Sequence, residues 1–104
     1  MREITCQEVH EQRNKVRIID VRTPEEFKGE LGHIENAELV TLGPDLINFL
    51  NTLNRDESVV FVCRSGARSG QTTLLSEEMG FRQTSNMLGG MIQWNNLNLP
   101  VVKE

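Results

Sequence analysis

One cysteine of this chain stands in a setting that favours a thiolate. The apolar run 59–62 leads into Cys63, and a Gly-containing turn follows before a helix is expected. Backbone N–H groups of a tight turn and the positive end of a following helix both stabilise negative charge. Two arginines, Arg64 and Arg68, add positive charge close to the sulfur. Because the thiolate is the reactive form of cysteine, Cys63 is the predicted nucleophile.

The size of the pKa shift decides how much of such a cysteine is the reactive thiolate at neutral pH. An ordinary cysteine, with a pKa near ~8.5, is only a few per cent ionised at neutral pH, whereas a pKa about two units lower leaves roughly three quarters as thiolate. An inert buried thiol at a strand end is the alternative interpretation, and the composition of the loop argues against it. The predicted site has Cys63 as catalytic residue and, as substrate-binding residues, Arg64, Ser65, Gly66, Ala67, Arg68 and Ser69.

A second candidate group lies where an earlier strand ends. Asp20 closes a predicted strand, and Arg22 comes just before the Thr23–Glu26 segment, whose Thr and Glu form a capping-box pattern with Pro at the first helical position. A buried ion pair that fixes the loop is more plausible for Asp20 and Arg22 than a catalytic role. Both are therefore predicted to be supporting residues.

Strands and helices alternate along the predicted chain. Short apolar runs between turn residues predict strands near 16–20, 39–42, 59–62 and 84–88. Caps and helical spacing predict helices near 5–13, after Thr23, after Gly43, over 69–79 and around Trp94. This alternation predicts an α/β fold with parallel strands and crossover helices.

Composition limits the function classes. The 104 residues carry a net charge of −4 and suit one domain over 1–104, with no basic face for nucleic acid. Cys6 and Cys63 are too few for a disulfide framework, and with two histidines they show no zinc-ligand spacing. The first twenty residues lack the apolar core of a signal peptide or membrane span. We expect a cytoplasmic protein without a metal, a cofactor or a membrane partner.

Three separated segments resemble the signatures of single-domain rhodanese-like sulfurtransferases (the thiosulfate sulfurtransferase family). They are residues 19–27 with the continuation to Ala37, the loop 63–69, and residues 88–94. The resemblance implies a five-stranded, largely parallel sheet flanked by helices on both faces. It also implies that the strand ending at Asp20 lies beside the one ending at Cys63, with the ligand site where the strand order changes direction.

The resemblance further implies sulfur transfer through a Cys63 persulfide. The expected partners are a small anionic sulfur donor such as thiosulfate, and a thiol or cyanide as acceptor, with a protein acceptor as a further option. Backbone N–H groups of the loop would stabilise the outer sulfur, while Arg64 and Arg68 orient the donor. No step requires a cofactor or metal.

Two alternatives remain. A persulfide carrier would hold sulfur for a protein partner and turn over thiosulfate poorly. A cysteine phosphatase or arsenate reductase is disfavoured by spacing, because four residues separate Cys63 from Arg68 where those phosphatases have five. The shorter ring of N–H groups suits one added sulfur atom better than a phosphoryl group.

Overall fold

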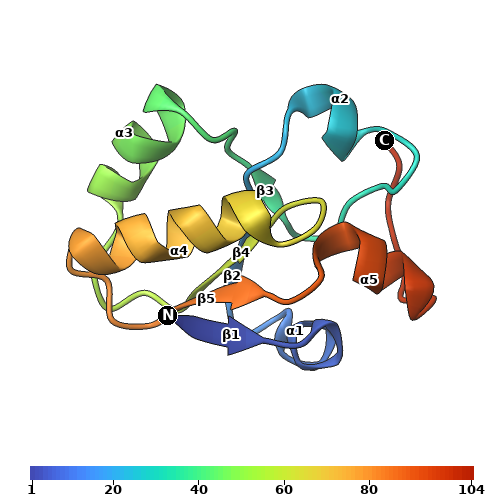
Figure 1. The fold of residues 1–104 in the computed structure, drawn as a ribbon, viewed down its shortest axis with the longest axis horizontal. Coiled ribbons are helices and arrows are strands. Elements are labelled where there is room, and N and C mark those ends of the chain that lie inside the picture. Colours follow the sequence, from blue (N-terminus) through green and yellow to red (C-terminus); the bar gives the residue numbers. More distant parts are fainter.

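The computed structural model describes residues 1–104 and shows the predicted α/β alternation (Figure 1). The strands are β1 (Arg2–Ile4), β2 (Arg17–Asp20), β3 (Glu38–Leu39), β4 (Val59–Val62) and β5 (Thr84–Met87). The helices are α1 (Cys6–Gln12), α2 (Pro24–Phe27), α3 (Pro44–Thr52), α4 (Ala67–Glu78) and α5 (Gly90–Asn96). None of these helices combines the length and the apolar character that crossing a membrane requires.

The five strands form one sheet in the order β1-β5-β4-β2-β3, and every pair is parallel. Strand β4 is central, with β2 and β5 as its neighbours. Asp20 at the end of β2 lies opposite Val62 at the end of β4, so the loops that follow both strands leave the same edge of the sheet. The implied neighbourhood of Asp20 and Cys63 is therefore confirmed.

Two layers of helices cover the sheet, as the resemblance implied. Along β2 and β4, successive side chains point to opposite faces of the sheet. On one face, α1 and α5 pack on Ile18, Val60 and Val62. On the opposite face, α3 and α4 lie over the remaining side chains, including Ile19 and Phe61. Because β4 is covered on both faces, all four of its residues are buried, as its continuous apolar run predicts.

Helix α4 buries a polar face. Its buried residues are Ser69, Gly70, Thr72, Thr73 and Ser76. The hydroxyls find partners in their own helix or on β5: Thr73 donates to the Ser69 carbonyl at 2.8 Å, and Ser76 bonds the Thr84 hydroxyl at 2.7 Å. Small, hydrogen-bonded side chains let the helix approach the sheet closely, which carries its first turn to the end of β4.

The predicted starts of α1 and α2 are confirmed, whereas two of the five strands were predicted wrongly or not at all. The capping boxes that begin α1 and α2 are both present, at Thr5 and Thr23. Strand β3 was placed too late and made too long, because only Glu38 and Leu39 pair with β2. The pattern missed β1, a three-residue strand at the sheet edge whose side chains are largely exposed and so lack an apolar signature.

A glycine turn joins β5 to α5 and packs against the loop after β4. Gly90 has a φ of +58°, and a Cβ atom at this position would lie 2.6 Å from the Cys63 carbonyl oxygen and overlap the Arg64 backbone. The first N–H groups of α5 use this closeness: Met91 donates to the Cys63 carbonyl at 2.9 Å, and Ile92 donates to the Arg64 carbonyl at 3.0 Å. Only glycine permits this approach.

We expect Gly90→Ala to destabilise the protein by at least about 3 kcal/mol, because the added methyl group displaces buried backbone that cannot move away. Gly80→Ala is the matched control: Gly80 has φ +98° but no atom within 4 Å of its Cβ position. It should cost only about 1 kcal/mol, the penalty of the backbone conformation. Urea unfolding measures both values, and equal losses would contradict the role given to close packing.

Candidate active site

The sulfur of Cys63 lies inside the turn that connects β4 to α4. The Gly66 N–H donates to Sγ at 3.1 Å, and the Ser69 hydroxyl lies 3.2 Å from the same atom. Gly66 has a φ of +103°, a conformation that turns the chain back over the sulfur and then begins the helix. The predicted loop thus surrounds the predicted nucleophile with hydrogen-bond donors.

Two opposing effects act on the Cys63 thiol, of which 1% is exposed. Burial is the largest single contribution and raises its pKa. Hydrogen bonds from the Ser69 hydroxyl and from the backbone N–H groups of Ser69, Gly66 and Ser65 act in the other direction. Together they hold the pKa of Cys63 below its ordinary value, so the setting favours the thiolate.

The other cysteine shows what burial does without these donors. Cys6 is equally buried, and its thiol donates to the carbonyl of Leu88 at 3.5 Å and to that of Gly90 at 3.8 Å. Burial raises the pKa of Cys6 by more than its own backbone N–H lowers it. The two carbonyls that face the thiol accept hydrogen bonds, so they add no donor for an anion. Both cysteines are free thiols, and only Cys63 has surroundings that favour ionisation.

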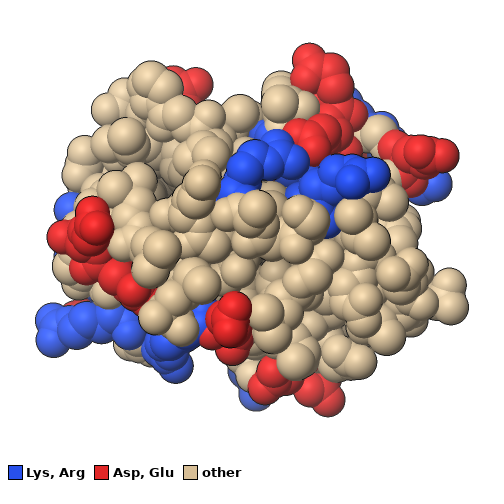
Figure 2. All heavy atoms as spheres, in the orientation of Figure 1, with Lys and Arg blue, Asp and Glu red and all other residues tan.

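Arg68 is held at the rim of the loop by a carboxylate from α2. Its guanidinium donates to both oxygens of Glu26, at 2.7 and 2.8 Å. The Arg68 hydrogen bonds are the main cause that lowers the pKa of Glu26 to about 2, and Glu26 in turn raises the pKa of Arg68. Figure 2 shows basic and acidic atoms side by side where α2 faces the start of α4.

Three of the remaining loop residues lie at the protein surface. Arg64, Ser65 and Ala67 are exposed. Arg64 lines a shallow cavity of about 130 Å³ together with four residues that follow β2: Arg22, Glu26, Glu30 and Leu31. This cavity directly adjoins the nucleophile's loop, since Arg64 is the next residue after Cys63.

Asp20 and Arg22 form a buried ion pair. The guanidinium meets the carboxylate in a fork, with Nε–Oδ1 2.9 Å and Nη2–Oδ2 2.7 Å, and both side chains are at most 1% exposed. The remaining Arg22 donors reach the carbonyl of Gly32 at 2.7 Å and that of Glu26 at 3.2 Å. The pair therefore ties the end of β2 to α2 and to the loop beyond it, which is consistent with a supporting role.

The sequence did not predict two residues that contact the loop after β4 or the start of α4, Glu26 and Asn86. Glu26 was recognised only as the capping residue of α2, and its contact with Arg68 spans 42 positions, which local pattern cannot reveal. Asn86 lies in β5 and faces the start of α4, where its side chain bonds both Ser69 and the Gly66 carbonyl. A polar residue near the end of a buried strand was the available signal for Asn86.

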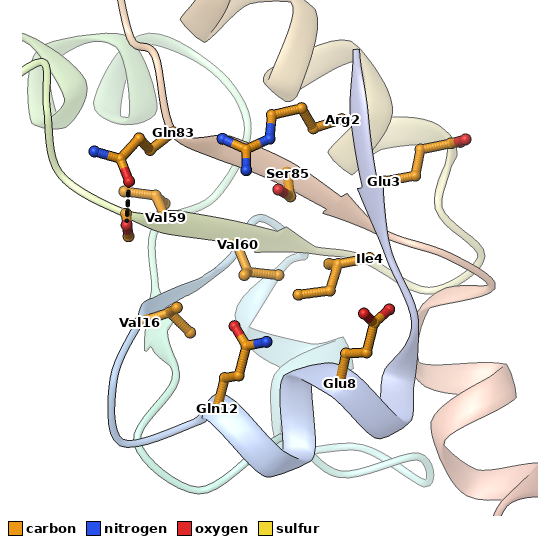
Figure 3. A pocket seen from close by; sticks show the side chains of 11 residues that line it. Arg2, Glu3, Ile4, Glu8, Gln12, Val16, Val59, Val60, Gln83 and Ser85 are labelled. Atoms are coloured by element: carbon orange, nitrogen blue, oxygen red, sulfur yellow. Dashed lines mark hydrogen bonds between the residues drawn. The ribbon is translucent and has the colours of Figure 1, made fainter.

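Another cavity lies at the opposite ends of the strands. The cavity drawn in Figure 3, of about 250 Å³, is bordered by β1, by the starts of β4 and β5, and by Glu8 and Gln12 of α1. The figure shows Ile4 and Val60 with Glu8 and Gln12 on one side of them and Arg2 and Ser85 on the other. No cysteine lines this cavity, so the chemistry expected of Cys63 takes place elsewhere.

The donors around Cys63 make a direct prediction for its reactivity. Ser69→Ala should raise the pKa of Cys63 by about one unit, because the anion loses a buried donor while burial persists. Ser65→Ala is the matched control, since its backbone N–H remains in place. Alkylation by iodoacetamide, followed against pH and located on Cys63 by mass spectrometry, measures both values. A pKa that is unchanged in Ser69→Ala would contradict the assignment.

The buried ion pair makes a second prediction, for stability. Asp20→Asn should cost about 3 kcal/mol, because Arg22 is left as an uncompensated buried charge. Asp56→Asn is the control, because the side chains of the Asp56–Arg82 pair are 62% and 75% exposed. The control should change stability by about 0.5 kcal/mol or less. Urea unfolding at neutral pH compares the two, and a small loss for Asp20→Asn would contradict the structural importance of the pair.

Comparison with known proteins places this geometry in a family. The Rhodanese-like domain matches residues 5–97. YtwF from Bacillus subtilis is 39% identical over 83 residues, which cover 80% of this chain and 77% of that protein. A sulfurtransferase from Allochromatium vinosum is 36% identical over 88 residues, covering 84% of this chain and 78% of the relative.

The fold gives the same result. The crystal structure of a rhodanese-related protein from Thermoplasma volcanium superposes with a TM-score of 0.87 at 26% identity, and each chain is covered completely. The predicted resemblance in sequence and the five-stranded fold it implied are thus both confirmed. The chain belongs to the rhodanese-like sulfurtransferase family.

Proposed function

We propose that this protein transfers sulfane sulfur from thiosulfate or a persulfide to a thiophilic acceptor through a persulfide on Cys63. The observation that carries the proposal is the surrounding of Cys63 by hydrogen-bond donors, which lowers the pKa of the thiol despite nearly complete burial. A thiolate is the form that attacks sulfur, and a stabilised thiolate also leaves readily. One setting therefore serves both halves of the reaction.

In the first half, the Cys63 thiolate attacks the outer sulfur of thiosulfate. A bond forms between Sγ and that sulfur, the sulfur–sulfur bond of the donor breaks, and sulfite leaves with the bonding electron pair. The negative charge moves to the outer sulfur of the new persulfide. Backbone N–H groups of the loop 64–69 supply donors for this charge without using a cofactor or a metal.

In the second half, an acceptor thiolate or cyanide attacks the outer sulfur. A bond forms between acceptor and outer sulfur, and the Cys63–sulfur bond breaks with its electron pair returning to Sγ. The Cys63 thiolate is regenerated with the same donors around it as at the start. A protein thiol can take the place of the small acceptor.

The charged side chains near Cys63 have different roles in binding the sulfur donor. Arg64 is exposed beside the 130 Å³ cavity, so we assign it contact with the anionic end of the donor. Arg68 is fixed by Glu26 and contributes a constant positive charge near the sulfur. Asp20 and Arg22 hold the wall of this cavity rather than contact the reacting atoms.

Burial of Cys63 sets the size of the donor. With 1% of the residue exposed, the thiolate admits only a slender group, and entry calls for a small outward movement of the loop. A terminal sulfane sulfur is one atom wide, whereas a phosphoryl group carries three oxygens around the atom under attack. The narrow access favours sulfur transfer over phosphate chemistry. The free thiols also suit a reducing compartment such as the cytoplasm.

Intact mass spectrometry after incubation with thiosulfate tests the proposal. We expect a gain of one sulfur atom, reversed by cyanide and absent from Cys63→Ser. Cys6→Ser is the matched control and should load fully, because the Cys6 thiol has a raised pKa and faces carbonyl groups. Loading that survives in Cys63→Ser, or none with either thiosulfate or a low-molecular-weight persulfide, would overturn the proposal.

Turnover separates the enzyme from the persulfide carrier. A transferase should release thiocyanate from thiosulfate and cyanide in many cycles, whereas a carrier should load stoichiometrically and turn over slowly. Rapid cleavage of a phosphomonoester that depends on Cys63 would favour the phosphatase interpretation instead.

A further inference from the structure

A series of buried hydrogen bonds connects Cys63 through Ser69 to Asn86 in β5. The Ser69 hydroxyl lies 3.2 Å from Cys63 Sγ and 2.5 Å from Asn86 Oδ1. On its other side, Asn86 Nδ2 donates to the Gly66 carbonyl at 3.1 Å. Ser69 is 0% exposed and Asn86 4%, so protein atoms supply the partners in this series.

The hydrogen bonds among Cys63, Ser69 and Asn86 lack one proton when Cys63 is a thiolate. The Ser69 hydroxyl has a single proton, while the Cys63 thiolate and Asn86 Oδ1 are both acceptors. Rotating the amide does not resolve the shortage, because Oδ1 would then face the Gly66 carbonyl, which is also an acceptor. When Cys63 is ionised, one buried acceptor is therefore left without its donor, at a cost in free energy.

Other states of Cys63 remove the conflict. As a neutral thiol, Cys63 can donate to Ser69 Oγ, and Ser69 then donates to Asn86. As a persulfide, Cys63 carries its charge on the outer sulfur, and Sγ becomes a weak acceptor. Ser69 can then turn its proton to Asn86 without taking a donor away from an anionic Sγ. The hydroxyl only reorients, and no proton is transferred.

We propose that Asn86 is a positioning residue that competes with Cys63 for the Ser69 proton and so favours the sulfur-loaded cysteine over the free thiolate. The proposal rests on the proposed function for its second part, because loading forms the Cys63–sulfur bond and releases sulfite. Its first part, the competition for one proton, depends only on the hydrogen bonds. Asn86 keeps the thiolate reactive by limiting how far its surroundings stabilise it.

The other charges near Cys63 are independent of Asn86. Arg64 follows Cys63 directly and is exposed. Arg68 of α4 is paired with Glu26 of α2, and Asp20 of β2 is paired with Arg22. The other neighbours, the β5 residue Asn86 itself and the start of α5, bring no titratable group. Substitutions at Asn86 therefore change which acceptor the Ser69 hydroxyl bonds, while these ion pairs stay in place.

A double-mutant cycle tests the competition. Asn86→Leu, which removes both polar atoms at similar volume, should lower the pKa of Cys63 by about one unit, since Ser69 then serves the thiolate alone. In the Ser69→Ala background the same substitution should leave the pKa unchanged. Asn86→Ala repeats the comparison, and thermal unfolding confirms that each variant folds. Alkylation of Cys63 against pH provides the pKa values.

Two results would overturn the competition. A downward shift of equal size with and without the Ser69 hydroxyl would show that Asn86 acts through loop shape. An upward shift would show that it supports the thiolate.

Persulfide loading tests the second part. At a fixed ratio of thiosulfate to sulfite, Asn86→Leu should load roughly tenfold less at equilibrium than the parent, in line with its more stable thiolate. Unchanged or increased loading would overturn this part of the proposal. If the parent protein itself takes up no sulfur, the proposed function fails, and the pKa cycle still decides whether Asn86 competes for the proton.

Discussion

The site is organised around hydrogen bonds that favour a thiolate on Cys63, a residue almost entirely out of contact with water. A buried thiolate is unfavourable unless donors replace the solvent, and the loop after β4 supplies them from its own backbone and from Ser69. This requirement explains why the turn contains a glycine with positive φ and why a helix must begin directly after it. The contrast with Cys6 shows that burial alone gives the opposite result.

Neighbouring elements hold this loop in place through close contacts. Helix α5 donates N–H groups of its first turn to the carbonyls of Cys63 and Arg64, so these two carbonyls face α5. The absence of a side chain at Gly90 allows that approach. On the other face, the small hydroxyl residues of α4 let its first turn reach the sulfur.

Charge around the site is arranged in pairs of different character. The Asp20–Arg22 pair is buried and connects three segments, so it supports the shape of the wall. The Arg68–Glu26 pair is partly exposed and joins the two helices that border the loop. Asn86 adds a neutral group, whose Oδ1 accepts a hydrogen bond from the Ser69 hydroxyl that also lies beside Cys63 Sγ.

Sequence was sufficient for those features that local chemistry specifies. The apolar run 59–62 predicted a strand, and the caps at Thr5 and Thr23 predicted where helices begin, because these signals act over a few residues. The prediction that Cys63 is the nucleophile likewise rests on the residues that follow it directly, and the Gly66 N–H among them donates to its sulfur. Only the tertiary structure brought Glu26 to Arg68 and Asn86 to Ser69, since these contacts depend on how α2 and β5 lie against the start of α4. Strand pairing and helix packing over long separations determine such contacts, and short-range patterns carry no record of them.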